Sequence, residues 1–139
     1  MIKFDKRTSN DFLDKEWSMK LSEFGVPMND NKYWLVEIDG TLFITNDISD
    51  VVYLKEHNHP AYPTYTLSEL IYKIPEWIDP YGGLVVSKDA PFYYIGYEKC
   101  GNDDDLFCIH EYPIIAAAQL LIKIVERGYK CVENIDKKL

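Results

Sequence analysis

Two short patterns combine side chains that could bind a metal ion. The first is His57-x-His59 and the second is Cys108-x-His110. Imidazole nitrogens and a thiolate are common ligands of tetrahedral Zn²⁺, so a fold that joined the two pairs would create a metal site. Neither pattern has the Cys-x₂₋₄-Cys or His-x₃₋₅-His spacing of structural zinc sites. The favoured interpretation is a surface pair of histidines and a buried cysteine, with the metal site kept as an alternative.

Cys108 could also be the nucleophile of a small cysteine-dependent enzyme. A nucleophilic thiol needs a base nearby, and His110 is a candidate for that base. The sequence contains no Gly-x-Ser-x-Gly, no Gly-x-Gly-x-x-Gly and no phosphate-binding Gly-x-x-x-x-Gly-Lys-Ser/Thr. We therefore predict no catalytic residue and no cofactor, and we favour a non-enzymatic role over an enzyme.

Aromatic side chains gather in the middle third of the chain, and they offer a different kind of function. Tyr and Trp are favoured where one end of a side chain is buried and the other is wet, and they anchor many interfaces. A packed core would use the same residues, so a core and a surface for a protein partner or self-association both stay open. The predicted partner-binding residues are Tyr72, Trp77, Tyr81, Tyr93 and Tyr97.

Composition limits the classes of partner. The 139 residues include 23 acidic and 15 basic side chains, for a formal net charge of −8. An acidic surface repels phosphate, so we expect neither nucleic acid nor anionic membranes as partners. No stretch approaches the about 20 apolar residues of a membrane span. Three cysteines, an odd number, do not suggest a disulfide framework. These features predict a single cytoplasmic domain over residues 1–139.

Helix signals occur at three places in the chain. Apolar residues recur at helical spacing over residues 9–24, with Ser9 or Asn10 as a candidate cap. Thr66 and Glu69 have the spacing of a capping box, and a short helix should follow and end before Pro75. Residues 113–127 are apolar around most of the helix circumference, which is typical of a buried helix or of one that also takes part in a subunit contact.

Strand signals separate these helices. The runs at 33–38 and 41–45 flank Asp39-Gly40, which favours a two-residue hairpin. Further strands are expected at 51–54, 84–86, 92–97 and 106–110, with loops at 57–63 and 101–105. The fold class is therefore α+β, with an antiparallel sheet of about five to six strands and two or three helices. The C-terminal helix should pack on one face of that sheet.

The order of these elements also resembles a known group of proteins. Thr66-Leu67-Ser68-Glu69-Leu70 before a sheet and Tyr112-Pro113-x-x-Ala116 at the start of a late Leu-rich helix resemble small phage and prophage proteins of gut bacteria. The resemblance spans most of the chain. It implies an accessory protein of a mobile element and brings no activity or site residue with it.

The leading functional hypothesis is thus a non-enzymatic protein-interaction module of phage or prophage origin. A small metal- or cysteine-dependent enzyme is the first alternative. A self-assembling structural protein is the second, and the broad apolar surface of the last helix is what suggests it.

Overall fold

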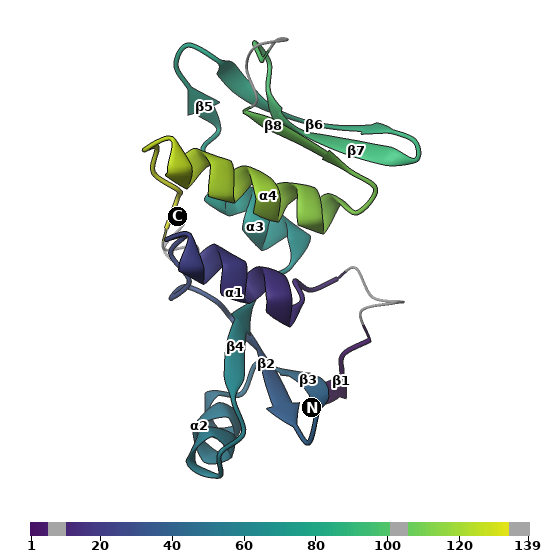
Figure 1. Ribbon diagram of the computed structural model, residues 1–139, viewed down its shortest axis with the longest axis vertical. Helices are drawn as coiled ribbons and strands as arrows, with labels where there is room; N and C mark the ends of the chain where they lie inside the picture. The colour runs from purple at the N-terminus through teal and green to yellow at the C-terminus, as the bar shows by residue number, and fades with distance from the viewer. Residues whose placement is uncertain (6–10, 101–105, 134–139) are drawn as a thin grey trace.

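The fold is α+β and contains two antiparallel sheets rather than one. The computed structural model describes residues 1–5, 11–100 and 106–133, and within them lie four helices and two four-stranded sheets (Figure 1). The α+β prediction is confirmed, whereas the prediction of one sheet with five to six strands is wrong. The candidate caps Ser9 and Asn10 and the predicted loop at 101–105 lie outside the described residues.

The first sheet forms around the predicted hairpin. Its strands are β1 (Ile2–Lys3), β2 (Tyr33–Ile38), β3 (Thr41–Thr45) and β4 (Ala61–Thr64), in the order β1-β3-β2-β4. Between β2 and β3, Asp39 and Gly40 have φ angles of 50° and 81°, the positive values that a type I′ turn requires. Ile38 pairs with Thr41 across the turn, which confirms the predicted two-residue hairpin.

Two local predictions next to this sheet are wrong. Residues 51–54 lie in a helix, α2 (Ile48–Glu56), because Asp47 caps its N-terminus by accepting a hydrogen bond from the Ser49 N–H. Residues 61–63 lie in β4 and not in a loop. Pro63 is tolerated there because β4 is an edge strand, where a missing N–H need not break a ladder.

The second sheet contains the last four strands in chain order. They are β5 (Trp77–Ile78), β6 (Gly82–Asp89), β7 (Phe92–Tyr97) and β8 (Phe107–His110), in the order β5-β6-β7-β8. The register places Val86, Ile95 and Cys108 side by side on neighbouring strands. The predicted strands at 84–86, 92–97 and 106–110 are confirmed, and β6 is longer than expected.

The other three helices follow their capping signals. α1 (Lys15–Glu23) begins later than predicted because the Asp14 carboxylate accepts a hydrogen bond from the Trp17 N–H at 3.0 Å. α3 (Leu67–Lys73) has the predicted capping box. α4 (Pro113–Glu126) begins at its proline, as expected.

α4 lies at the centre of the layered arrangement. One side of α4 packs on β7 and β8, other sides pack on α1 and α3, and α1 also contacts β4 of the first sheet (Figure 1). The apolar residues of α4 are therefore covered within the chain, and they supply seven buried side chains to the core. The apolar surface that suggested self-assembly is thus core and not a free face.

Candidate functional site

The two pairs of candidate metal ligands lie in different parts of the molecule. His57 and His59 follow α2, which packs on the first sheet, whereas Cys108 and His110 lie in β8 of the second sheet (Figure 1). No group of three or more His, Cys, Asp or Glu side chains within the described ranges could hold a metal ion. The hypothesis that these four residues form one site is therefore wrong.

His57 and His110 make local contacts instead, and Cys108 is buried. The His57 Nδ1 lies 2.8 Å from the Tyr53 carbonyl oxygen, and its ring stacks on Tyr53. The His110 Nδ1 accepts a hydrogen bond from the Tyr112 N–H at 3.0 Å. Burial raises the pKa of the Cys108 thiol, which disfavours the thiolate that a nucleophile needs.

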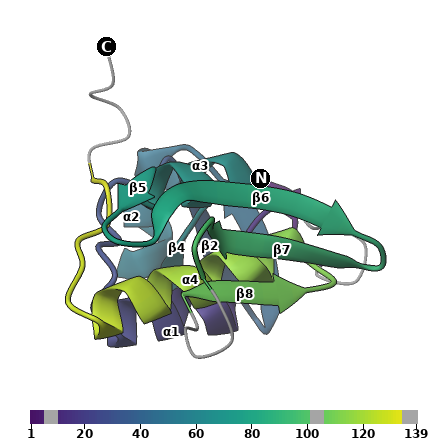
Figure 2. The same cartoon turned by 90° about the horizontal axis from the view of Figure 1, so that it is seen from above.

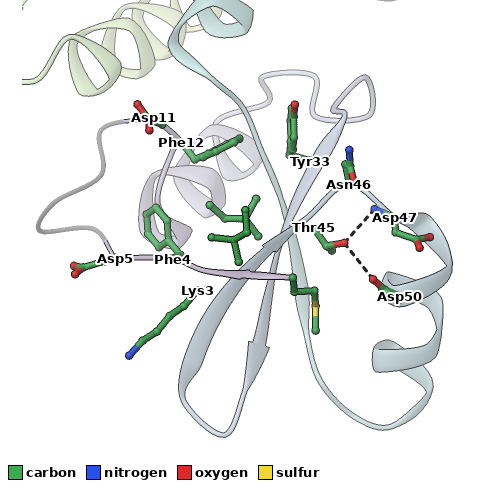
Figure 3. Close-up of a pocket in the computed structure, with 13 residues that line it drawn as sticks. Lys3, Phe4, Asp5, Asp11, Phe12, Tyr33, Thr45, Asn46, Asp47 and Asp50 are labelled. Carbon is green, nitrogen blue, oxygen red and sulfur yellow. Dashed lines mark hydrogen bonds between the residues drawn. The ribbon is translucent and has the colours of Figure 1, made fainter.

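A cavity of about 600 Å³ lies beside β1 in the first sheet (Figure 3). Its walls combine apolar and aromatic side chains with carboxylates, a combination that could in principle receive a cationic ligand. The aromatic residues are Phe4, Phe12 and Tyr33, and the acidic ones are Asp5, Asp11, Asp47 and Asp50.

The carboxylates of this cavity do not converge on one point. Figure 3 shows the side chains of Asp5 and Asp47 pointing to opposite sides. Asp47 accepts hydrogen bonds from the Ser49 hydroxyl and N–H, which lower its pKa, and Asp50 accepts one from the Thr45 hydroxyl. Asp47 and Asp50 therefore stabilise the start of α2, and we assign no ligand to the cavity.

The predicted partner-binding aromatics divide between core and surface. Tyr97 is fully buried and its hydroxyl donates to the Pro75 carbonyl oxygen at 2.7 Å, so it is a core residue and not part of a contact surface. Tyr72 and Tyr81 are partly buried. Tyr93 is also partly buried, with the Lys88 ammonium 5.7 Å from its ring centroid. Trp77 differs from all of these, since 60% of it is exposed.

Trp77 belongs to a larger apolar surface on the second sheet. Alternation along the strands places one set of side chains toward α4 and the other set on the opposite side. No described helix or strand covers this opposite side, which faces the viewer in Figure 2. We call it the outer face, defined by Trp77, Val85, Phe92, Tyr94, Phe107 and Ile109.

The outer face is exposed at its rim and closely packed at its centre. Trp77, Phe92 and Ile109 are 60%, 48% and 55% exposed. At the centre, the rings of Tyr94 and Phe107 stack with centroids 5.4 Å apart. Phe107 lies directly opposite Gly96 in the neighbouring strand, where the missing side chain leaves room for it.

Sequence reasoning missed five of these six residues. Only Trp77 was among the predicted contact residues, with Phe92 and Tyr94 in the same aromatic cluster and Val85, Phe107 and Ile109 unconsidered. The alternation within residues 92–97 carried a usable signal, because Phe92, Tyr94 and Gly96 must face away from Tyr93, Ile95 and Tyr97.

A partly buried thiol and two buried phenols predict a loss of stability at alkaline pH. Burial raises the pKa of Cys131 from 9.0 to about 11, and it also raises those of Tyr65 and Tyr97. The unfolded chain therefore releases these protons first, so the stabilisation is complete below pH 9 and is lost as pH rises toward 11. One such group changes the free energy of unfolding by up to about 1.4 kcal/mol per pH unit.

Urea denaturation in reducing buffer across this pH range tests the expectation. Cys131→Ala should flatten the decline between pH 9 and pH 11 relative to the wild type. Cys100→Ala is the control, since Cys100 is also a free, partly buried cysteine. An equal decline in the wild type and in Cys131→Ala would contradict the assignment.

The chain matches no protein-family model, no curated protein and no solved structure. Within the described ranges, no helix has both the length and the apolar character to cross a membrane. A function therefore has to be inferred from the geometry of this chain.

Proposed function

We propose that the chain is a non-enzymatic protein-binding module whose contact surface is the outer face. The observation that supports this is the exposure of three large apolar side chains, Trp77, Phe92 and Ile109, on one uncovered side of a sheet. Contiguous exposed apolar surface on a folded protein is typical of interaction sites, and Trp and Tyr are enriched among the residues that dominate binding.

The edge of the sheet favours docking onto this face over the addition of a new strand. β8 is an edge strand, and its Phe107 carbonyl accepts a hydrogen bond from the Lys123 ammonium at 2.9 Å. A lysine at an edge strand hinders pairing with another strand. A partner that packs side chains on Trp77 and Ile109 needs no free edge.

The resemblance to small phage and prophage proteins adds a biological role to this proposal, that of an accessory protein of a mobile element. An accessory protein of a mobile element that binds another protein in the cytoplasm would fit the acidic charge of −8 and the outer face. A second copy of the chain is the other partner that an apolar face could accept.

Variants at the two ends of the molecule test the proposal. The double variant Trp77→Ser, Ile109→Ser removes exposed apolar groups from the outer face, and Val52→Ser, Tyr53→Ser removes similarly exposed groups from α2. Each immobilised protein would capture partners from a lysate of the cells that express it, quantified by mass spectrometry. We expect about tenfold lower recovery with the outer-face variant, because buried anchor residues contribute about 1.4 kcal/mol or more.

Circular dichroism should first establish that both variants stay folded. A partner retained by the outer-face variant but lost by the α2 variant would contradict the proposal. Sedimentation of the purified protein identifies the alternative partner, since a dimer that the outer-face variant abolishes would make the partner a second copy.

A further inference from the structure

We infer that the outer face binds a protein segment carrying a Lys or Arg side chain beside apolar residues, with the cation seated between Trp77 and Glu98. The inference rests on the proposed function and names the chemistry of its partner. It comes from the corner of the sheet where β5 meets β6.

One row of residues on neighbouring strands crosses this corner, and it consists of Trp77, Gly83 and Glu98. Trp77 pairs with Gly83, and the N–H of Glu98, the residue after β7, donates to the Gly83 carbonyl oxygen at 3.0 Å. A Cβ placed on Gly83 would lie 2.5 Å from the Glu98 Oε1 and 3.8 Å from the Trp77 Cε3. The carboxylate and the indole are therefore neighbours across a residue without a side chain.

A second carboxylate orients the indole. The Trp77 Nε1–H donates to the Asp79 Oδ1 at 2.9 Å. The ring is thus held by Asp79 at its N–H edge, the Glu98 carboxylate lies across Gly83 from its benzene edge, and Trp77 stays 60% exposed. Cations are attracted to the face of a Trp ring and form their strongest hydrogen bonds with carboxylates. This corner accordingly suits an ammonium or a guanidinium group.

The charges of the outer face complement a basic partner. Asp89 and Glu98 lie at positions on this side of the sheet, whereas Lys88 alternates to the other side and lies over Tyr93. Lys123 reaches the β8 edge, where the Phe107 carbonyl engages it. Among the described residues, no Lys, Arg or His forms an ion pair with Glu98. With a net charge of −8, the whole chain would also steer a basic partner toward it.

The apolar part of the segment has a place beside this corner. Val85 and Phe107 occupy the next row of the outer face, and Tyr94 and Ile109 occupy the row after that. The rows of Trp77 and Ile109 lie four residues apart along the strands, or about 13 Å, and β5 and β8 are three strand spacings apart, or about 14 Å, so a diagonal of about 20 Å separates Trp77 from Ile109. An extended segment of about six residues spans that distance. A segment with a basic residue at Trp77 can therefore place an apolar residue at Ile109, where 55% of the side chain is exposed.

Selection from a display library of random dodecapeptides on the immobilised full chain tests this inference. We expect enriched peptides to combine Lys or Arg with aliphatic or aromatic residues. They should bind Glu98→Gln about tenfold more weakly than the wild type, because the amide lacks the negative charge that pairs with Lys or Arg. Glu56→Gln on α2 removes an exposed carboxylate far from the outer face and should leave binding unchanged.

The outcomes separate this inference from the proposed function. Enriched apolar peptides that lack basic residues and need Trp77 but not Glu98 would overturn the inference and leave the proposed function standing. A failure to enrich any peptide whose binding falls in Trp77→Ser would overturn both.

Discussion

Asp30→Asn is expected to lower the free energy of unfolding by about 3–5 kcal/mol. The Lys73 ammonium is fully buried and donates to both Asp30 carboxylate oxygens, at 2.8 and 2.9 Å. The Tyr65 hydroxyl donates to the same carboxylate at 2.7 Å. Replacement of the carboxylate by an amide leaves a buried ammonium without a counter-charge, and such a charge is strongly destabilising.

A partly exposed ion pair in the same chain provides the matched control. Lys15 and Glu37 lie 3.1 Å apart, but their side chains are 32% and 24% exposed. We expect Glu37→Gln to lower the free energy of unfolding by less than about 1 kcal/mol, because solvent screens the pair. Urea denaturation followed by Trp fluorescence measures both variants. Equal losses for Asp30→Asn and Glu37→Gln would contradict the assignment.

The double variant Asp30→Leu, Lys73→Met distinguishes two contributions to the free energy of unfolding. One is the net stabilisation by the ion pair, and the other is the penalty for leaving one buried charge without a partner. Both charges disappear together, so no buried charge is left without a partner. We expect the double variant to be more stable than Asp30→Asn.

Gly96→Ala is expected to lower the free energy of unfolding by about 3 kcal/mol. The added Cβ would overlap the Phe107 Cβ, lie 2.7 Å from the Phe107 Cα and lie 3.0 Å from the Leu106 carbonyl oxygen. Two of these three contacts are with backbone atoms, so β8 itself would have to move away from β7. Because Phe107 belongs to the outer face, the same change should weaken partner capture.

Gly83 in the neighbouring strand offers the control. Its added Cβ would also be crowded, but by the Glu98 carboxylate at 2.5 Å, which is the end of a flexible side chain. Gly83→Ala should therefore lower the free energy of unfolding by less than about 1 kcal/mol, in the range of surface substitutions and small rotamer changes. Urea denaturation of the two variants compares them, and a larger loss for Gly83→Ala would refute this explanation.

Local signals in the sequence determined the elements whose interactions lie within a few residues. Asp39-Gly40 predicted the hairpin because the turn alone requires positive φ angles. Thr66 and Glu69 predicted the start of α3 because a capping box closes within one helical turn. Pro113 and the apolar run after it predicted α4, because proline is favoured in the first turn of a helix and this preference is also local.

Other elements depended on partners that are distant in the sequence. Residues 51–54 have strand-forming side chains, yet they form a helix because Asp47 caps it and Val51 is buried against the first sheet. Residues 61–63 have two prolines in their neighbourhood, yet they form β4 because β2 offers a strand to pair with. Propensity is a weak predictor where tertiary contacts compete with it.

The candidate site likewise has features that local sequence signals predicted and features that depend on contacts between distant elements. The sequence by itself determined that aromatic residues gather near Trp77, that the chain is acidic, and that β7 alternates two sets of side chains. Only the tertiary structure decided that α4 covers the set containing Tyr97 and leaves the set containing Tyr94 open. It also placed His57 at the end of α2, beside the first sheet, placed Cys108 in the second sheet, and brought Trp77 and Glu98 together across Gly83. Burial and charge pairing depend on which elements meet, and the meeting of distant elements has no signal in local spacing.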